Sequence, residues 1–270
     1  MKRYINKVIR RIKHHSHVYV SLKMQNEQLR KFKNIHQGKD CIIMGAGPSL
    51  NEIPHDFLKK FVVIGTNLSF KYYTPDYWVV IDAQYSWMEE GRKLCREKNI
   101  PAFINWLWAP DFPDEIHENE ISLHPYRIST EQSPKNRQLR KNLLNTFNDP
   151  VVLEKKGVTS VNSVVPEGAI PIAAYMGFKR IFLSGVDFYT PKKGPLHFIE
   201  DAKEDLARID KLKKNIQKAD NTQKDLFAYK RWPIELVGKS KLKDRVFNLS
   251  EKSTVKNIPK INFTEVILDS

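Results

Sequence analysis

The stretch DCIIMGAGPSLNEI, from Asp40 to Ile53, constrains the fold of this chain more than any other. Cys41 to Met44 is a short apolar run, which is typical of a buried strand. Gly45 and Gly47 follow at once and permit backbone angles and close approaches that a side chain forbids. A strand, a glycine turn and a helix start leave backbone N–H groups directed at one spot, which suits a phosphate. The dinucleotide fingerprint G-x-G-x-x-G lacks its third glycine, because Leu50 stands there, so the alternative is a tight turn without a ligand.

The turn also carries signs of a helix start. Ser49 and Glu52 have the spacing of a capping box, which predicts that a helix opens at the serine. Pro54 indicates that this helix is short or begins afresh.

Apolar runs rich in valine and isoleucine alternate with helical patterns along the rest of the chain. The predicted strands are 41–44, 61–64, 77–81, 102–106, 180–185 and 245–249, and the predicted helices are 85–98, 160–177 and 200–219. Strands of this kind, separated by helices, require a mostly parallel sheet covered on both faces. The sequence therefore predicts an α/β, Rossmann-like domain over residues 39–270. Within it, residues 109–148 are expected to form an irregular insert or lid with one helix at 136–146.

The positive charge is concentrated at the N-terminus. Residues 1–40 contain eleven lysines and arginines against Glu27 and Asp40, which gives +9 of the total +14. Ile5, Val8 and Ile9 recur at helical spacing among these charges, so residues 1–38 are predicted to be a basic amphipathic helical extension. One interpretation is binding to an anionic membrane surface, and another is packing on the chain's own domain. Nucleic acid is not expected, because no mixture of basic and aromatic residues continues into the globular part.

Cysteine usage and hydropathy indicate the compartment. Cys41 and Cys95 fall inside a predicted strand and a predicted helix, so they are expected to be buried thiols in a reducing environment. No apolar run reaches the length of a membrane span, and the N-terminus has no apolar segment of the kind found in signal peptides. We therefore expect a cytoplasmic protein that lies at the inner face of the membrane.

Polar residues stand where the predicted strands end. They are Ser49, Asn67, Asp82, Asp187 and Tyr189. Ligands of parallel α/β sheets bind outside the carboxyl ends of the strands, so these side chains are expected to share one crevice.

Three stretches, taken together, resemble a known superfamily. IIMGAGPSLNEI resembles the opening strand and GPSL turn of bacterial CMP-sialic-acid sialyltransferases, flagellar motility accessory factors and pterin-pyrophosphokinase-like proteins. Ser163 to Tyr189 resembles their second block, a helix of small residues followed by a strand that ends in Gly-x-Asp-aromatic. Val246 to Ser253 resembles their closing strand and serine-bearing turn. The resemblance implies an enzyme that transfers a sialic-acid-like (nonulosonic) sugar from a CMP donor, without a metal, to a surface-glycan or glycolipid acceptor.

The resemblance also implies roles for individual residues. The residues that it places on the nucleotide side are Gly45, Gly47, Ser49, Asn67, Ser163, Gly185, Tyr189 and Ser253. Asp82 takes the place of an asparagine near the donor, and Asp187 is a candidate catalytic carboxylate or a cap of the loop that follows it. The sialyltransferases have a histidine base about thirty residues after the Gly-x-Asp strand, but no histidine follows His197 in this chain. His197 instead resembles the histidine of the motility accessory factors and is the candidate general base.

Two further functions stay open. The sequence contains no metal-ligand cluster and no Asp-x-Asp after a strand. A pyrophosphokinase-like enzyme nevertheless remains an alternative, and it would need Mg²⁺. The other alternative is a non-catalytic nucleotide-binding partner in glycan assembly.

Overall fold

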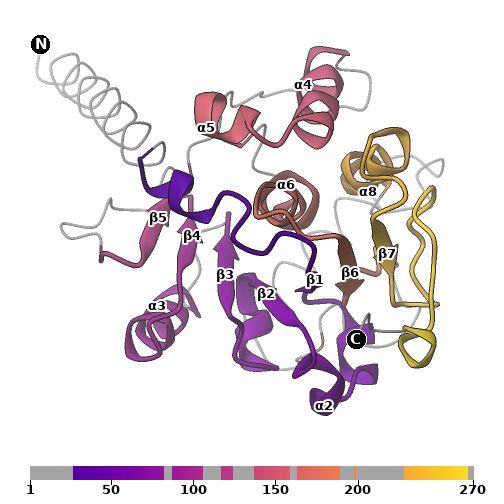
Figure 1. Ribbon diagram of the computed structural model, residues 1–270. Coiled ribbons are helices and arrows are strands. Elements are labelled where there is room, and N and C mark those ends of the chain that lie inside the picture. Colours follow the sequence, from indigo (N-terminus) through magenta and orange to yellow (C-terminus); the bar gives the residue numbers. More distant parts are fainter. Residues whose placement is uncertain are drawn as a thin grey trace, which may run out of the picture.

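The structure is a computed structural model that describes residues 27–81, 87–105, 117–123, 137–158, 163–188, 198 and 228–266. A seven-stranded sheet lies at its centre, with strand order β5-β4-β3-β2-β1-β6-β7, and each neighbouring pair of strands is parallel (Figure 1). The strands are β1 (Asp40–Met44), β2 (Val62–Thr66), β3 (Tyr77–Val80), β4 (Ala102–Ile104), β5 (Glu120–Ser122), β6 (Arg180–Ser184) and β7 (Val246–Asn248). The predicted α/β, Rossmann-like fold is confirmed.

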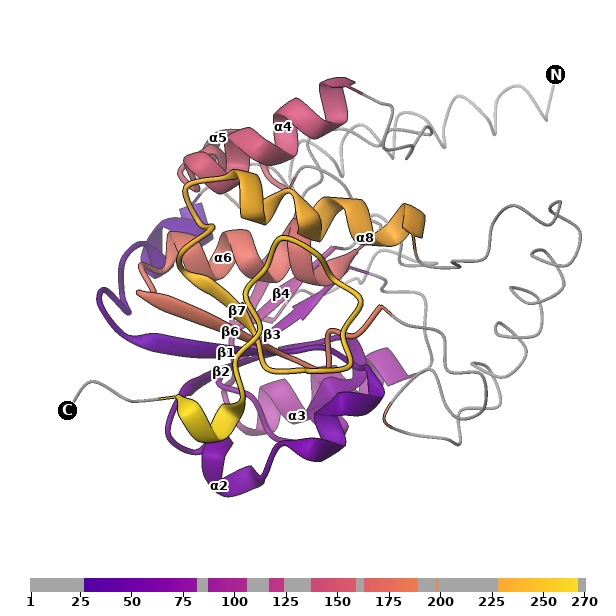
Figure 2. The same cartoon turned by 90° about the vertical axis from the view of Figure 1, so that its right-hand side faces the viewer.

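Helices cover both faces of the sheet, as the edge-on view in Figure 2 shows. On one face lie α4 (Arg137–Asn148), α5 (Val152–Lys156), α6 (Ile170–Tyr175) and α8 (Ala228–Glu235), and on the other lie α2 (His55–Leu58) and α3 (Trp87–Glu97). The short helical turns are η1 (Arg30–Phe32), η2 (Pro48–Glu52), η3 (Asn67–Lys71), η5 (Val165–Ala169), η6 (Val237–Lys239) and η7 (Phe263–Glu265). Strand β1 shows why both faces of the sheet are covered by helices. Its residues Cys41 and Ile43 pack into one hydrophobic core, and Ile42 and Met44 pack into another. An uninterrupted apolar strand needs a helix layer on each side.

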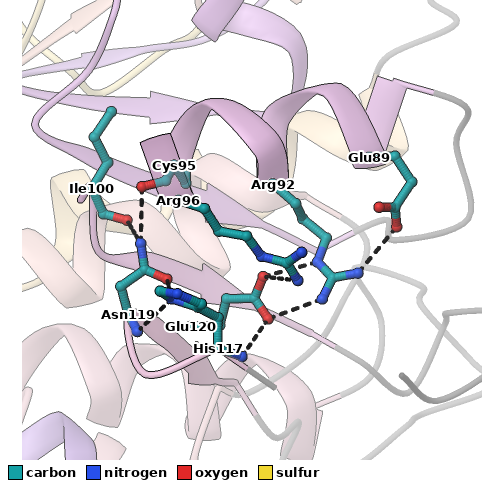
Figure 3. A network of polar contacts seen from close by, with 8 residues as sticks. All are labelled: Glu89, Arg92, Cys95, Arg96, Ile100, His117, Asn119 and Glu120. Atoms are coloured by element: carbon teal, nitrogen blue, oxygen red, sulfur yellow. Dashed lines mark hydrogen bonds and ion pairs between the residues drawn. The ribbon is translucent and has the colours of Figure 1, made fainter. Parts of the chain in front are cut away.

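Strand β5 was not expected, since it lies inside residues 109–148, which the sequence predicts as an irregular insert. It has three residues and begins with Glu120, so no apolar run marks it. The Glu120 side chain is buried and accepts hydrogen bonds from Arg92 at 2.8 and 3.1 Å and from Arg96 at 3.2 Å (Figure 3). Both arginines lie on α3, so this ion-pair cluster holds α3 against the edge of the sheet. The helix predicted at 136–146 corresponds to α4.

The last part of the predicted extension belongs to the domain. Leu29 is fully buried, the Asn34 N–H donates to the Tyr175 carbonyl at 3.1 Å, and the His36 N–H donates to the Met176 carbonyl at 2.9 Å. Residues 27–38 therefore pack on the end of α6. The amphipathic stripe at Ile5, Val8 and Ile9, to which the two interpretations apply, lies outside the described residues. Residues 1–26 lie outside the described part, and so does the predicted helix at 200–219. Within the described ranges, no helix has the length and apolar character needed to cross a membrane.

Candidate functional site

The site is located by the topology of the sheet. The strand order runs from β1 outward through β2 to β5 on one side and through β6 to β7 on the other. The direction of winding thus changes between β1 and β6, which are hydrogen-bonded neighbours. At such a switch point the loops after the two strands leave in opposite directions, and α/β proteins bind ligands there. The loops concerned begin at Gly45 and Gly185.

A serine and a carboxylate join these two loops. The Ser49 hydroxyl donates to Asp187 Oδ1 at 2.5 Å, and the Ser49 backbone N–H donates to Asp187 Oδ2 at 2.9 Å. Ser49 is 4% exposed and Asp187 is 3% exposed, so the pair is buried. Since both carboxylate oxygens accept a hydrogen bond from Ser49, the geometry gives Asp187 a partner that offsets the cost of its burial.

The expected phosphate cradle takes a different form in the structure. The N–H of Gly45 donates to the Ser184 carbonyl at 2.7 Å, and the N–H of Gly47 donates to the Gly185 carbonyl at 2.8 Å. With the N–H of Ser49 on Asp187, three N–H groups of the turn point at β6 and its loop. The expectation that these groups are free to hold a phosphate is therefore wrong, because the crossover strand provides their acceptors.

The glycines of the turn are required by the same contact. A side-chain carbon on Gly47 would lie 2.7 Å from the Gly185 carbonyl oxygen and would also overlap the Asp187 carboxylate. A side-chain carbon on Gly45 would overlap the Gly185 carbonyl as well. Gly185 itself has φ +65°, a conformation that favours glycine. These glycines therefore allow the two loops to approach each other closely.

The predicted capping box at Ser49 and Glu52 is also wrong. Turn η2 begins at Pro48, its N-cap is Gly47, and the Ser49 side chain turns to Asp187 instead of back to the helix. Glu52 pairs with Lys252. The Ser49 hydroxyl therefore bonds the other loop and does not cap the turn.

The segment after β7 completes the junction. The Ser253 hydroxyl donates to the Val186 carbonyl at 2.9 Å, and the Thr254 N–H donates to the Asp187 carbonyl at 2.9 Å. The Thr254 hydroxyl donates to the Phe188 carbonyl at 2.6 Å. Three consecutive carbonyls at the exit of β6 are thus held by two residues, and Phe188 is held there at φ +50°. Of these two residues, Ser253 is a predicted site residue.

Asn248 and Thr254 are residues of this junction that the sequence analysis missed. Asn248 Nδ2 donates to the Val186 carbonyl at 3.1 Å and to the Ser253 hydroxyl at 3.0 Å. Arg231 of α8 donates from Nη1 to the Thr254 hydroxyl at 2.8 Å. The run NLSEKST, which begins inside the predicted strand 245–249 and continues beyond it, is the signal that identifies such a polar turn.

The same edge carries buried polar atoms without a partner among the described residues. They are Asn67 Oδ1 after β2, Ser184 Oγ at the end of β6 and Ser250 Oγ after β7. Asn67 has φ +48°, and its carbonyl accepts from Trp78 Nε1 at 2.7 Å, so its backbone is fixed. Because a buried polar atom without a partner is costly, these atoms indicate where a ligand's polar groups would be received.

Ser163 lies before the π-turn η5, which packs on β3. Its N–H donates to the buried carboxylate of Glu167 at 3.1 Å, and a side-chain carbon on Gly168 would be 3.2 Å from the side chains of Val79 and Ile81. The backbone of Ser163 is therefore held at the start of a turn that packs on β3. Single π-turns of this kind are frequent at functional sites.

The remaining predicted site residues, Asp82, Tyr189 and His197, lie outside the described residues. Among the residues that are described, no group of three His, Cys, Asp or Glu side chains is placed to hold a metal ion. The structure thus brings together Gly45, Gly47, Ser49, Gly185, Asp187 and Ser253. It places Asn67 directly after β2 and Ser163 before the turn that packs on β3.

A family model of 6-hydroxymethylpterin diphosphokinase MptE-like proteins matches residues 16–193. The chain belongs to this family. The match confirms the superfamily to which the GPSL stretch is similar, and it covers β1 to β6 with both loops of the switch point. Strand β7 and the Ser253 turn follow the matched residues.

Comparison with curated proteins gives no match. Among solved structures, the sialyltransferase CstII from Campylobacter jejuni, in complex with cytidine-5'-monophosphate, is 18% identical over 83% of this chain and 85% of its own, with a TM-score of 0.45. The monofunctional α-2,3-sialyltransferase Cst-I from the same organism is 17% identical over 86% of this chain and 83% of its own, with a TM-score of 0.45. At this level of similarity we draw no functional conclusion from either structure.

Proposed function

We propose that this MptE-like protein is a glycosyltransferase that moves a nonulosonic sugar from a CMP donor to a glycan or glycolipid acceptor. The observation that carries the proposal is the junction at the β1–β6 switch point. The three stretches that resemble the CMP-sugar transferases meet there through the bonds of Ser49 to Asp187 and of Ser253 to the Val186 carbonyl. The three stretches are far apart in the sequence and thus meet at one edge of the sheet.

The edge suits a leaving nucleotide. Glycosyl transfer from a CMP-sugar expels a phosphate ester, and fixed hydroxyl and amide groups that receive it lower the barrier without moving. Asn67 Oδ1, Ser184 Oγ and Ser250 Oγ are buried polar groups at this edge with no partner in the described ranges. We assign the two serine hydroxyls, which can donate hydrogen bonds, to the phosphate of the donor. Asn67 Oδ1 is an acceptor, so we assign it to an N–H or O–H group of the donor.

We assign the acceptor's proton to His197, ten residues after Asp187. A histidine titrates near neutrality, which suits a general base. In the structure Asp187 is held by Ser49 through both oxygens, and this favours a positioning role for the carboxylate. His197→Ala is expected to lower turnover by about a hundredfold or more with little change in donor affinity.

The second candidate function is a Mg²⁺-dependent diphosphokinase-like reaction, which the family match favours. Such a reaction would place ATP at the same edge, with Asp82 as the candidate Mg²⁺ ligand. Metal dependence separates the two candidates. A protein that binds CMP but turns over no substrate would instead be a nucleotide-binding partner.

The deciding experiment is a thermal-shift panel of CMP, UDP, GDP, ATP and CMP-sugars, each with and without Mg²⁺. A ligand at a hundred times its dissociation constant adds roughly 2.7 kcal/mol to stability, which is readily measured. Stabilisation by CMP without Mg²⁺ supports the glycosyltransferase. Stabilisation by ATP with Mg²⁺ alone would assign the diphosphokinase reaction.

We place the protein at the inner face of the membrane, where lipid-linked and surface glycans are assembled. The +9 charge of residues 1–40 supports this location, because basic amphipathic segments bind anionic lipid.

A further inference from the structure

The net charge of the described residues is concentrated on one face. Segments 27–40, 148–156, 177–180 and 237–245 contain twelve lysines and arginines and five acidic residues. All the other described residues together contain fifteen basic and thirteen acidic residues. We call the exposed side chains of these four segments the basic face.

The four segments are contiguous in space. The Lys179 N–H donates to the Lys39 carbonyl at 2.6 Å, and Arg245 Nε donates to the Lys179 carbonyl at 3.2 Å. Lys241 N–H donates to Asn148 Oδ1 at 2.9 Å, which joins the loop before β7 to the end of α4. The lysines therefore form one surface around the amino ends of β1, β6 and β7, where the loops enter the sheet on the left of Figure 2.

Two of the acidic residues on this face are neutralised locally. Glu154 accepts hydrogen bonds from Lys33 at 3.2 Å and Tyr175 at 2.9 Å, and Asp40 is paired with Arg180 at 2.5 Å. Lysines such as Lys39, Lys155, Lys239 and Lys241 are exposed. The electrostatic potential outside the basic face is thus positive. It extends over about one Debye length, which is about 8 Å at physiological salt.

An apolar side chain stands within the basic face. Ile35 is 44% exposed and is the one large hydrophobic side chain that is exposed in the described ranges. Residues 1–26, which carry seven basic and no acidic residues, join the chain at this same face through Glu27. A basic surface with an apolar residue next to a basic amphipathic sequence fits a lipid bilayer better than a nucleic acid.

We propose that the basic face docks the folded domain on an anionic phospholipid bilayer. This orients the carboxyl edge of the sheet, with Ser49 and Asp187, away from the lipid. Strand β1 has five residues, so the two edges are separated by about 16 Å. The acceptor would therefore be reached on the aqueous side, at a sugar that projects from the bilayer. The inference deepens the membrane location proposed above and rests on it.

The test uses the full chain with Lys39, Lys155, Lys239 and Lys241 changed to Glu, together with a matched control. The control changes Lys93, Arg137, Lys141 and Lys260 to Glu; these residues are exposed outside the four segments, and the change alters the net charge equally. Binding is measured by sedimentation with vesicles of phosphatidylcholine containing phosphatidylglycerol. We expect the first variant to bind at least tenfold more weakly and the control to stay within about twofold of the wild type.

A second measurement tests orientation. Cys41 and Cys95 are buried, so Ile35→Cys and Glu251→Cys variants can be labelled selectively with an environment-sensitive dye. Addition of vesicles should shift the emission of the dye at position 35. The emission of the dye at position 251, which follows β7, should stay unchanged. Three results would overturn the proposal. They are equal losses of vesicle binding in the two charge-reversal variants, equal binding of the wild type to neutral and anionic vesicles, and an emission shift at position 251 alone. CMP binding by the same variants is a separate readout, so failure of the proposed function would be seen independently.

Discussion

The Ser49 hydroxyl donates to Asp187 Oδ1 at 2.5 Å, while the backbone N–H of the same serine donates to Oδ2 at 2.9 Å. The two residues are 138 positions apart in sequence and lie on the loops after β1 and β6. One carboxylate thus connects the two halves of the sheet at the point where its winding direction changes.

This relationship predicts opposite results for two substitutions of Asp187. Asparagine can accept the Ser49 N–H through Oδ1 and donate from Nδ2 to the serine hydroxyl, which accepts equally well. Asp187→Asn should therefore fold with near-wild-type stability and bind nucleotide normally. Asp187→Ala should lose about 1–3 kcal/mol, because two donors of Ser49 lose their acceptor. Chemical unfolding measures the stability of each variant, and nucleotide titration measures its affinity. If Asp187→Asn keeps nucleotide affinity but loses most of its turnover, the carboxylate takes part in the chemistry.

Thr254 should fix the exit of β6. Its hydroxyl donates to the Phe188 carbonyl at 2.6 Å and accepts from Arg231 at 2.8 Å. Thr254→Val keeps the shape but removes both bonds, so we expect a loss of about 1–2 kcal/mol in the free energy of unfolding. Thr254→Ser retains the hydroxyl and should behave as the wild type, and equal losses in the two variants would show that the methyl group matters instead.

The cluster in Figure 3 should contribute to stability and not to ligand binding. Glu120→Ala leaves Arg92 buried without its main partner, which costs about 3–5 kcal/mol in comparable pairs. Nucleotide affinity of the protein that remains folded should be unchanged, because α3 and β5 lie at the far edge of the sheet from β6. A selective loss of affinity with normal stability would contradict this assignment.

Stability should depend on pH through His36. Burial lowers the pKa of His36, Lys39 lowers it further, and Asp76 opposes both. Because the folded pKa lies below the unfolded value of about 6.5, the unfolded chain binds more protons in this range. Stability should therefore decrease as the pH falls below about 6.5 and level off below the folded pKa. His36→Gln should lack this step. An unchanged pH profile in that variant would assign the step to another group.

The sequence predicts the central sheet well, because apolar runs such as 41–44 and 180–185 are long enough to identify buried strands. It does not predict β5, because a strand of three residues that begins with Glu120 is as polar as a loop. Only the structure shows that Arg92 neutralises this carboxylate. The start that the sequence predicts for η2 is two residues too late, because the N-cap is Gly47 and not Ser49.

For the site, sequence reasoning selects Ser49, Asp187 and Ser253 but not their partners. Partners more than a hundred residues away follow from the crossover that brings β6 beside β1, and local patterns do not specify it. For the same reason the sequence predicts a free phosphate cradle at the glycine turn. The acceptors for its N–H groups belong to Ser184, Gly185 and Asp187, and they are visible only once the sheet is assembled.

Hydrogen exchange with and without CMP tests the central claim most directly, because it shows where the nucleotide binds. The proposal predicts that CMP protects backbone amides of residues 45–50, 185–188 and 248–254, at the carboxyl edge of the sheet around the β1–β6 switch point. It predicts no protection on the basic face. Protection confined to other segments, or none at saturating CMP, would contradict it.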